Sequence, residues 1–317
     1  MKVNKVFKLI FSDQIYFLTL LIAIMVLIAS IFNPAFFTIR NFLNVLNQVS
    51  VIGVVAAGAT LIMISGNFDI SVGSIVGLSC TSAALMIGNG NSVFWSIAFG
   101  FVLSVVCGLF NGVVIAKTRT PSFIISMAML SVYYGISLII TGGITKSLGG
   151  KFFQLGRGTL IGTIPNPILV LIIVYVFLHF VLTYTKLGRR IYAVGGNEEA
   201  AYLSGVNTDM TKIIVYGMNG MLVGLGAIVL LSRLGSALPS TGSGMELRAI
   251  AAVVIGGVPL TGGKGKALGT LLGTILLGLI SNVLNMLNIS AYYQEVVIGL
   301  IITVAVIAGN IGNMKRK

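Results

Sequence analysis

Long apolar stretches follow one another along this chain, separated by short polar segments. Seven are close to or above the length of about 20 residues with which an α-helix crosses a membrane: 15–32, 93–115, 122–141, 166–184, 212–232, 267–287 and 292–310. Three more are shorter: 50–65, 71–88 and 248–260. The apolar residues are continuous and do not alternate with polar ones, which favours helices over a transmembrane β-barrel. The pattern predicts an all-α polytopic membrane protein of about ten transmembrane segments, as ten crossings or as eight clear spans and two short or broken ones.

Composition agrees with a single transmembrane domain over 1–317. Hydrophobic residues make up 56% of the chain and charged residues 9%, and the mean hydropathy is +1.05. A soluble domain carries about 25% charged residues, so we expect lipid to be the main solvent of this surface. The 40 glycines suit closely packed or broken membrane helices. The stretch 15–32 is too long for a signal peptide and lacks a convincing small-residue cleavage site, so we expect a retained span.

The net charge of +13 would suggest a nucleic-acid partner in a soluble protein. In a membrane protein, Lys and Arg instead collect in cytoplasmic loops. Ten crossings from a cytoplasmic N-terminus divide the cations 14 to 6, with these on the outer side: Arg40, Lys146, Lys151, Arg157, Arg233 and Arg248. We therefore expect an inner-membrane protein with both termini and the loop 185–211 in the cytoplasm, the loop 142–165 outside, and no nucleic-acid partner.

Two regions of the chain are weakly alike. Residues 65–78 and 242–266 each combine Gly, Ser and an acid at the start of a short apolar segment, and each leads to a long span. Transporters are often built from such repeats. We take a pseudo-repeat as a hypothesis.

Motifs for enzymatic chemistry are absent from the sequence. The nearest match to a phosphate-binding loop has Gly265 after Gly263-Lys264, where Ser or Thr would hold magnesium. His179 has no Cys or His partner in sequence, and Cys80 and Cys107 lie in apolar stretches as small buried residues. We expect no enzyme activity, no metal and no cofactor in this chain.

The loop 185–211 contains two of the seven acidic residues of the chain. Asn197 is a good N-cap, and Glu198 and Glu199 fall in the first turn, where they favour the helix dipole. A short helix then continues through Ala200 and Ala201, and Gly205 follows at its C′ position. These residues by themselves are also compatible with an ordinary capped helix on the protein surface.

A second polar site lies at the break before 71–88. An acid near membrane depth costs roughly 2.5–3.5 kcal/mol on insertion scales, so Asp69 needs compensation. We expect it to cap the segment that begins at Ile70-Ser71; contact with a substrate hydroxyl and proton coupling are the alternatives. Near 248–260, Glu246 and Arg248 are two residues apart and do not face each other on a helix, so a simple ion pair is not expected.

Five segments together resemble the ribose-type monosaccharide permeases of ABC importers: "NPAFFTIRNFLNVLNQVSV", "GNFDISVGSIVGL", "LGRRIYAVGGNEEAAYLSGVN", "ELRAIAAVVIGGVPLTGGKGKALGTLLG" and "NISAYYQEVVIGLIITVAV". They extend over about 33–306. The sequence departs from the family at one motif. The family usually has Gly-Gly-Ile-Asp-Leu-Ser where this chain has Gly-Asn-Phe-Asp-Ile-Ser at 66–71, and this change puts ribose itself in doubt as the substrate.

The resemblance implies partners and site residues. A separate ABC subunit would bind ATP-Mg, a sugar-binding protein would deliver substrate, and a second permease, identical or paralogous, would complete the pathway through the lipid. The coupling residues would be Glu198, Glu199, Ala200, Ala201 and Gly205. Pathway residues would be Asn67, Phe68, Asp69, Ser71 and Glu246. A non-sugar substrate such as a nucleoside or autoinducer, or an ion-driven transporter, remains an alternative.

Overall fold

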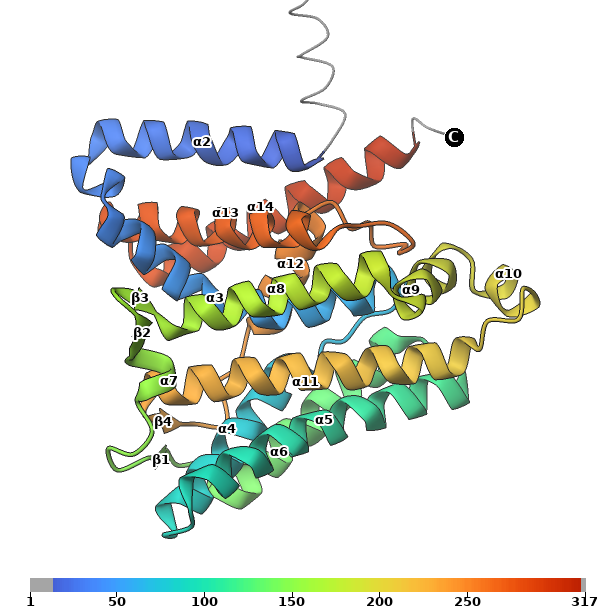
Figure 1. Ribbon diagram of the computed structural model, residues 1–317, viewed down its shortest axis with the longest axis horizontal. Coiled ribbons are helices and arrows are strands. Elements are labelled where there is room, and N and C mark those ends of the chain that lie inside the picture. The colour runs from blue at the N-terminus through green and yellow to red at the C-terminus, as the bar shows by residue number, and fades with distance from the viewer. Residues whose placement is uncertain (1–13, 315–317) are drawn as a thin grey trace, which may run out of the picture.

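The computed structural model describes residues 14–314, which form a bundle of roughly aligned helices (Figure 1). In chain order the helices are α2 (Gln14–Phe32), η1 (Pro34–Phe37), α3 (Ile39–Ile64), α4 (Val72–Gly88), α5 (Val93–Thr118), α6 (Ser122–Thr141), α7 (Gln154–Arg157), α8 (Asn166–Tyr184), α9 (Lys186–Gly196), α10 (Glu198–Leu203), α11 (Thr208–Leu234), α12 (Met245–Ile255), α13 (Ala267–Met286) and α14 (Ala291–Met314). Four short strands are β1 (Lys146–Ser147), β2 (Thr159–Ile161), β3 (Ile164–Pro165) and β4 (Ser236–Ala237).

Seven helices in the described part are long and apolar enough to cross a membrane: α2, α3, α5, α6, α8, α11 and α13. The prediction of a mostly helical polytopic protein is confirmed. One boundary was wrong, because the stretch expected at 50–65 is the end of α3, a helix of 26 residues. Polar residues such as Asn44 and Gln48 interrupt the apolar run in its first half. Thr38 nevertheless starts the helix, since its Oγ1 accepts a hydrogen bond from the backbone N–H of Asn41 (3.2 Å).

The helix ends gather at two opposite ends of the bundle (Figure 1). At one end, here the α10 end, lie α9, α10 and the C-terminus of α3. At the other, the strand end, two small antiparallel pairs join β1 to β4 and β2 to β3. The loop 142–165 contains α7 and three of these strands. Six terminal cations used in the charge count lie outside the described residues: Lys2, Lys5, Lys8, Lys315, Arg316 and Lys317.

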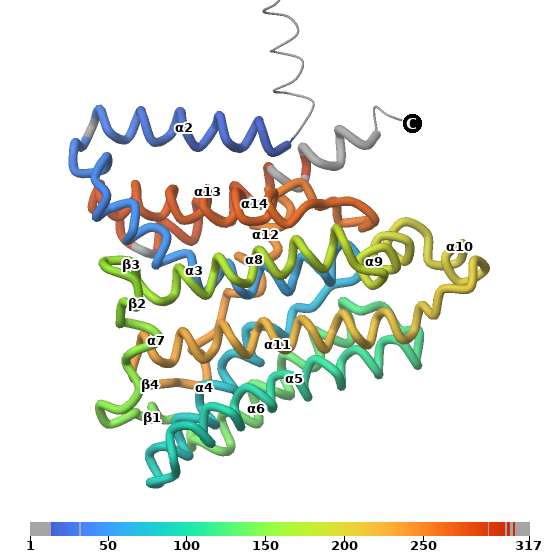
Figure 2. Tube along the Cα trace, in the orientation of Figure 1, coloured from blue at the N-terminus to red at the C-terminus, as the bar shows by residue number. Residues whose placement is uncertain are grey.

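The two short helices α4 and α12 run in opposite directions. The loop 65–71 leads from the α10 end into α4, whose last residue, Gly88, lies near the Ser147 carbonyl at the strand end. The loop 238–244 leads from the strand end into α12, and Gly256 after it packs against Gly269 at the start of α13. Figure 2 shows the resulting successions, α3–α4–α5 and α11–α12–α13, each long, short and long. The segment 248–260 is therefore an 11-residue helix that begins earlier, at Met245, and ends at Ile255.

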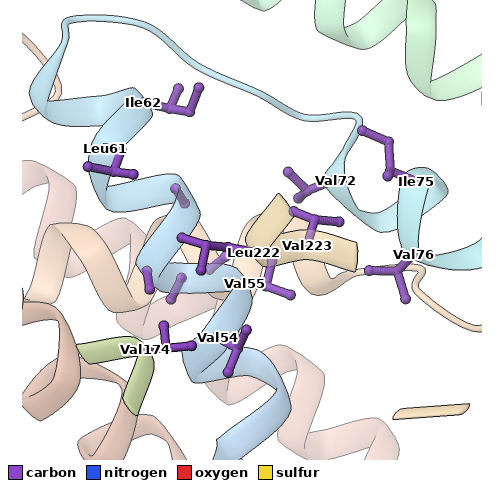
Figure 3. Close-up of a cluster of buried hydrophobic side chains, with 14 of the residues drawn as sticks. Val54, Val55, Leu61, Ile62, Val72, Ile75, Val76, Val174, Leu222 and Val223 are labelled. Atoms are coloured by element: carbon purple, nitrogen blue, oxygen red, sulfur yellow. The ribbon is translucent and has the colours of Figure 1, made fainter. Parts of the chain in front are cut away.

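The core lies around α3, α4 and α11. Val54 and Val55 of α3 meet Ile75 of α4 and Leu222 and Val223 of α11 in one buried cluster (Figure 3). Helices α2 and α6, in contrast, are mostly exposed although they are apolar. An apolar exterior around a buried centre is what a lipid solvent requires.

Candidate functional site

Helix α10 is a short helix with both ends capped, as the sequence predicts. The Asn197 side chain accepts a hydrogen bond from the backbone N–H of Ala200 (2.9 Å). At the other end Gly205 has φ +82, and the backbone N–H of Val206 donates to the carbonyl of Ala201 (3.0 Å). This is a Schellman ending, which needs a residue tolerant of positive φ at Gly205.

The two acids of α10 have different surroundings. Glu198 Oε1 forms an ion pair with Lys212 Nζ of α11 at 2.6 Å, and the Lys212 side chain is only 10% exposed. Within residues 14–314, Glu199 has no such partner, and its side chain lines a groove beside the helix. Ala201 is buried, at 6% exposure. Glu198 therefore connects α10 to α11, and the side chain of Glu199 is exposed.

Helix α9 anchors this region to the bundle. Burial raises the pKa of Tyr192, so its hydroxyl stays protonated and donates to the Gly265 carbonyl (2.8 Å). Gly195 lies so close to the end of α3 that a methyl group on it would be 1.8 Å from the Ile64 carbonyl oxygen. The backbone N–H of Gly263 donates to this same carbonyl (2.8 Å). Movement of α9 and α10 would therefore reach both loops that precede or follow the short helices.

A groove of about 1490 Å³ opens at the α10 end. One wall comes from α10 and the loop after it, including Glu199 and Tyr202; the facing wall includes Phe123 and the loop residues Asn67 and Phe68. The structure thus brings two of the expected pathway residues next to the expected coupling helix. The sequence had treated these as separate sites.

Asp69 lies at the centre of a buried hydrogen-bond network. Its Oδ1 accepts from the backbone N–H (2.9 Å) and from the Oγ (2.6 Å) of Ser71. Its Oδ2 accepts from Asn219 Nδ2 on α11 (2.9 Å). The N-cap of α4 is Ser71, without a side-chain capping bond. Asp69 therefore holds the turn before the helix and is not its N-cap, which corrects the expected position by two residues.

The network extends to α5 and α6. Asn111 Nδ2 donates to Ser71 Oγ (2.8 Å), and its Oδ1 accepts from the Tyr133 hydroxyl (2.9 Å). Asn219 Oδ1 is buried with no hydrogen-bond partner among the described residues. Sequence reasoning missed Asn111 and Asn219, and the available signal was that each is a polar residue within a long apolar stretch.

The backbone of Phe68 is held as well. Its N–H donates to Ser122 Oγ (3.0 Å), and its carbonyl accepts from the Tyr216 hydroxyl (2.6 Å). The loop 65–71 is therefore tied to α5, α6 and α11 at once.

Glu246 lies where the two short helices meet. Its Oε1 accepts from the backbone N–H of Gly244 (3.1 Å), and its Oε2 is buried without a partner in the described part of the chain. Gly73, in the first turn of α4, lies directly against this carboxylate. Arg248 pairs with Glu295 of α14 and not with Glu246, as the spacing predicts.

Within residues 14–314, no group of three or more His, Cys, Asp or Glu side chains could hold a metal ion. His179 contacts Thr183, whose Oγ1 lies 3.4 Å from Nδ1, and its ring lies edge-on to that of Tyr184, with the ring centroids 6.0 Å apart. The arrangement can support conformational coupling and polar contacts along a path.

Comparison with known proteins identifies the family to which this chain belongs. Residues 41–306 match the family model described as "Branched-chain amino acid transport system / permease component". Ribose import permease protein RbsC of Escherichia coli (strain K12) is 41% identical over 297 residues, which cover 92% of each chain. RbsC of Bacillus subtilis (strain 168) is 42% identical over 287 residues, or 90% of this chain and 89% of the relative. L-arabinose transport system permease protein AraH of Escherichia coli (strain K12) is 38% identical over 298 residues, or 93% and 90%. No solved structure matches.

Proposed function

This chain belongs to the family described as branched-chain amino acid transport system permease components, and on that premise we propose that it is the membrane-spanning permease subunit of a bacterial ABC importer for a monosaccharide. It is not itself an enzyme. The substrate class comes from the relatives, whose names specify ribose and L-arabinose. The structural observation that carries the mechanism is α10, a doubly capped helix fastened at one end of the bundle beside the loop 65–71.

The chain forms one transmembrane domain of ten segments in the inner membrane. Eight helices cross fully, and the shorter helices α4 (17 residues) and α12 (11 residues) are the two remaining segments. The described cations support the orientation: Lys117, Arg119, Lys186 and Lys264 lie in elements of the α10 end, which we assign to the cytoplasm. The strand end then faces outward, and both termini are cytoplasmic.

Coupling runs through α10. A separate ATPase subunit binds ATP-Mg and holds the exposed face that includes Glu199 and Ala200, and the buried Ala201 packs this helix against its own chain. Glu198 and Gly205 keep this helix at a fixed angle to the bundle through the Lys212 ion pair and the Schellman ending. Because α9 contacts Ile64 and Gly265, the same movement reaches the loops beside α4 and α12.

The pathway passes the short helices. Asn67 and Phe68 face the cytoplasmic groove, Asp69 and Ser71 hold the loop, and Glu246 lies at the junction of α4 and α12. A sugar-binding protein delivers the substrate at the strand end. A second permease subunit completes the pathway. Opposed half-helices at the middle of a membrane protein are a recurring transporter arrangement, which supports this assignment.

The test is reconstitution of the tagged permease with its co-purifying subunits in proteoliposomes. We expect an ATP-binding subunit and a sugar-binding protein to co-purify, and uptake of D-ribose or L-arabinose to require ATP inside. Uptake by the permease alone, driven by an ion gradient, would overturn the proposal. A nucleoside or other non-sugar ligand on the binding protein would overturn only the substrate class.

A further inference from the structure

A second cavity, of about 360 Å³, lies between the strand end and the middle of the bundle. Its walls come from α3, α11, α12, α13 and α14 and from the loop before α12. None of the pathway residues named above lines it. Small-molecule sites in proteins commonly enclose about 300–1,000 Å³, so the cavity has the size of a monosaccharide site.

Two helices turn one regular face to this cavity. Gln48 and Ile52 of α3 are four residues apart, and Thr274, Gly278 and Ser281 of α13 follow at spacings of four and three. Residues at these spacings share a helix face. The polar members are therefore aimed at the cavity by the helix period, although both helices are otherwise apolar.

Several of the polar side chains have no partner in the protein. Among residues 14–314, the side chains of Gln48, Ser243 and Ser281 form no hydrogen bond. A serine in a membrane helix ordinarily bonds to the carbonyl of the preceding turn, as Thr274 does to Thr270 (2.8 Å). An unpaired amide at membrane depth is costly unless it lines a polar space. Gln48 and Ser243 are exposed and Ser281 is half-buried, so these groups are open to water or to a ligand that enters the cavity.

The charged and polar groups of the cavity wall indicate which ligands could bind there. Arg248 is paired with Glu295. The Arg233 guanidinium donates to the Asn47 carbonyl through NH1 (3.2 Å), and no carboxylate of the described chain pairs with it. No acidic side chain lines the cavity. The wall thus offers guanidinium, amide and hydroxyl groups, which can donate hydrogen bonds to the oxygens of a small ligand, and a sugar presents several such oxygens in a small volume.

We propose that this outer cavity is a transient binding site for the transported monosaccharide, with Gln48, Ser281 and Arg233 as its hydroxyl-binding groups. The proposal rests on the proposed function, because it takes the substrate class from it. The sugar occupies the cavity after it leaves the binding protein and before it reaches Glu246 at the junction of the short helices. Weak binding is expected, since a station on a transport path must release its ligand.

The first experiment uses cysteine reactivity in the permease–ATPase complex in nanodiscs, where both faces are open. Ser281→Cys places a thiol in the cavity, and Thr145→Cys places one on the exposed surface of the same end. The native cysteines Cys80 and Cys107 are buried, so the unsubstituted chain serves as the blank. A small water-soluble thiol reagent should label both variants. D-ribose or L-arabinose at millimolar concentration should slow labelling several-fold in Ser281→Cys and leave Thr145→Cys unchanged.

Failure to label Ser281→Cys, or labelling at a rate that neither sugar changes, would overturn the proposal. ATP-driven uptake by the unsubstituted importer is measured separately, and its absence would count against the proposed function and not against the cavity.

The second experiment compares transport of two sugars. Gln48→Leu and Ser281→Ala break no hydrogen bond within the described protein, so the fold loses no internal contact. In the complete importer each should change the ratio of D-ribose to L-arabinose uptake several-fold at matched levels of assembled importer. Thr145→Ala is the matched control. An unchanged ratio in both cavity variants, with or without an equal fall for both sugars, would contradict a role in sugar contact.

Discussion

Asn219 of α11 donates a hydrogen bond of 2.9 Å to Asp69 Oδ2, and through it the loop 65–71 is joined to a helix 150 residues away in sequence. The other carboxylate oxygen is occupied by Ser71. The buried acid is therefore fully engaged within the protein, which explains how its cost at membrane depth is offset.

Asp69→Asn should destabilise the protein by about 1–3 kcal/mol, because a neutral amide loses the charge-assisted hydrogen bonds from Ser71 and Asn219 and has one acceptor oxygen in place of two. The exchange Asp69→Asn with Asn219→Asp restores one donor and one acceptor across the same contact. We expect the double variant to recover thermal stability and uptake relative to either single variant. The measurement is a double-mutant cycle on melting temperature in detergent. Additive losses would show that the two side chains do not interact.

Gly73→Ala should lower stability and uptake together. The added methyl would lie 2.1 Å from Glu246 Oε2 and 2.6 Å from the Gly242 carbonyl, and a backbone carbonyl cannot swing away. Overpacking of this kind typically costs about 1–3 kcal/mol. Gly135→Ala in α6 is the control, since nothing lies within 4 Å of its added methyl. That variant should be neutral or slightly stabilising. Equal behaviour of the two would mean that α4 and α12 are not tightly apposed.

Glu198→Gln and Glu199→Gln should have different effects: the first on the attachment of α10 to the bundle, the second on binding of the ATPase subunit. Loss of Glu198 leaves Lys212 as a largely buried, unpaired cation, so the α10 region should lose protection from amide hydrogen exchange. Loss of Glu199 should leave that protection unchanged and weaken ATPase binding. Exchange by mass spectrometry and ATPase co-purification measure the two effects. The reverse assignment would contradict the division of roles between these acids.

Gly205→Val should disturb the end of α10, because a β-branched residue is strained at φ +82. Gly205→Asn is the matched control, since asparagine tolerates this conformation. Ala201→Glu should have a similar effect by placing a charge in a packed position. We expect both disruptive variants to insert in the membrane but to lose the ATPase or sugar uptake at matched permease levels. Normal assembly and normal uptake in both variants would show that this loop only connects two spans and does not couple them to the ATPase.

The two ends of the bundle should lie on opposite sides of the membrane. Single cysteines at Asn197 of the α10 end and at Gly149 of the strand end test this with a membrane-impermeant reagent. In right-side-out vesicles only the Gly149→Cys variant should label, and permeabilisation should expose the Asn197→Cys variant. Labelling of both from outside would contradict the ten-segment topology.

Local signals in the sequence were sufficient for several elements. Continuous apolar runs locate α5, α6, α8, α11 and α13, since burial in lipid requires about 20 apolar residues in succession. Asn197 and Gly205 define α10 because capping depends on neighbours within one helical turn. The start of α3 at Ile39 was missed because polar residues that line a cavity or contact other helices interrupt its run.

By itself, the sequence determined that this chain is a helical membrane protein without enzymatic motifs, and it contained the motifs of its family. Those properties depend on composition and on contacts between near neighbours. Only the tertiary structure decided that Asp69 meets Asn219, that Glu246 meets Gly73, and that Gln48 and Ser281 share a cavity. Each of these relationships joins residues from different elements of the fold. Helix packing sets their distance, and the period of a single helix carries no information about which partner its polar face will meet.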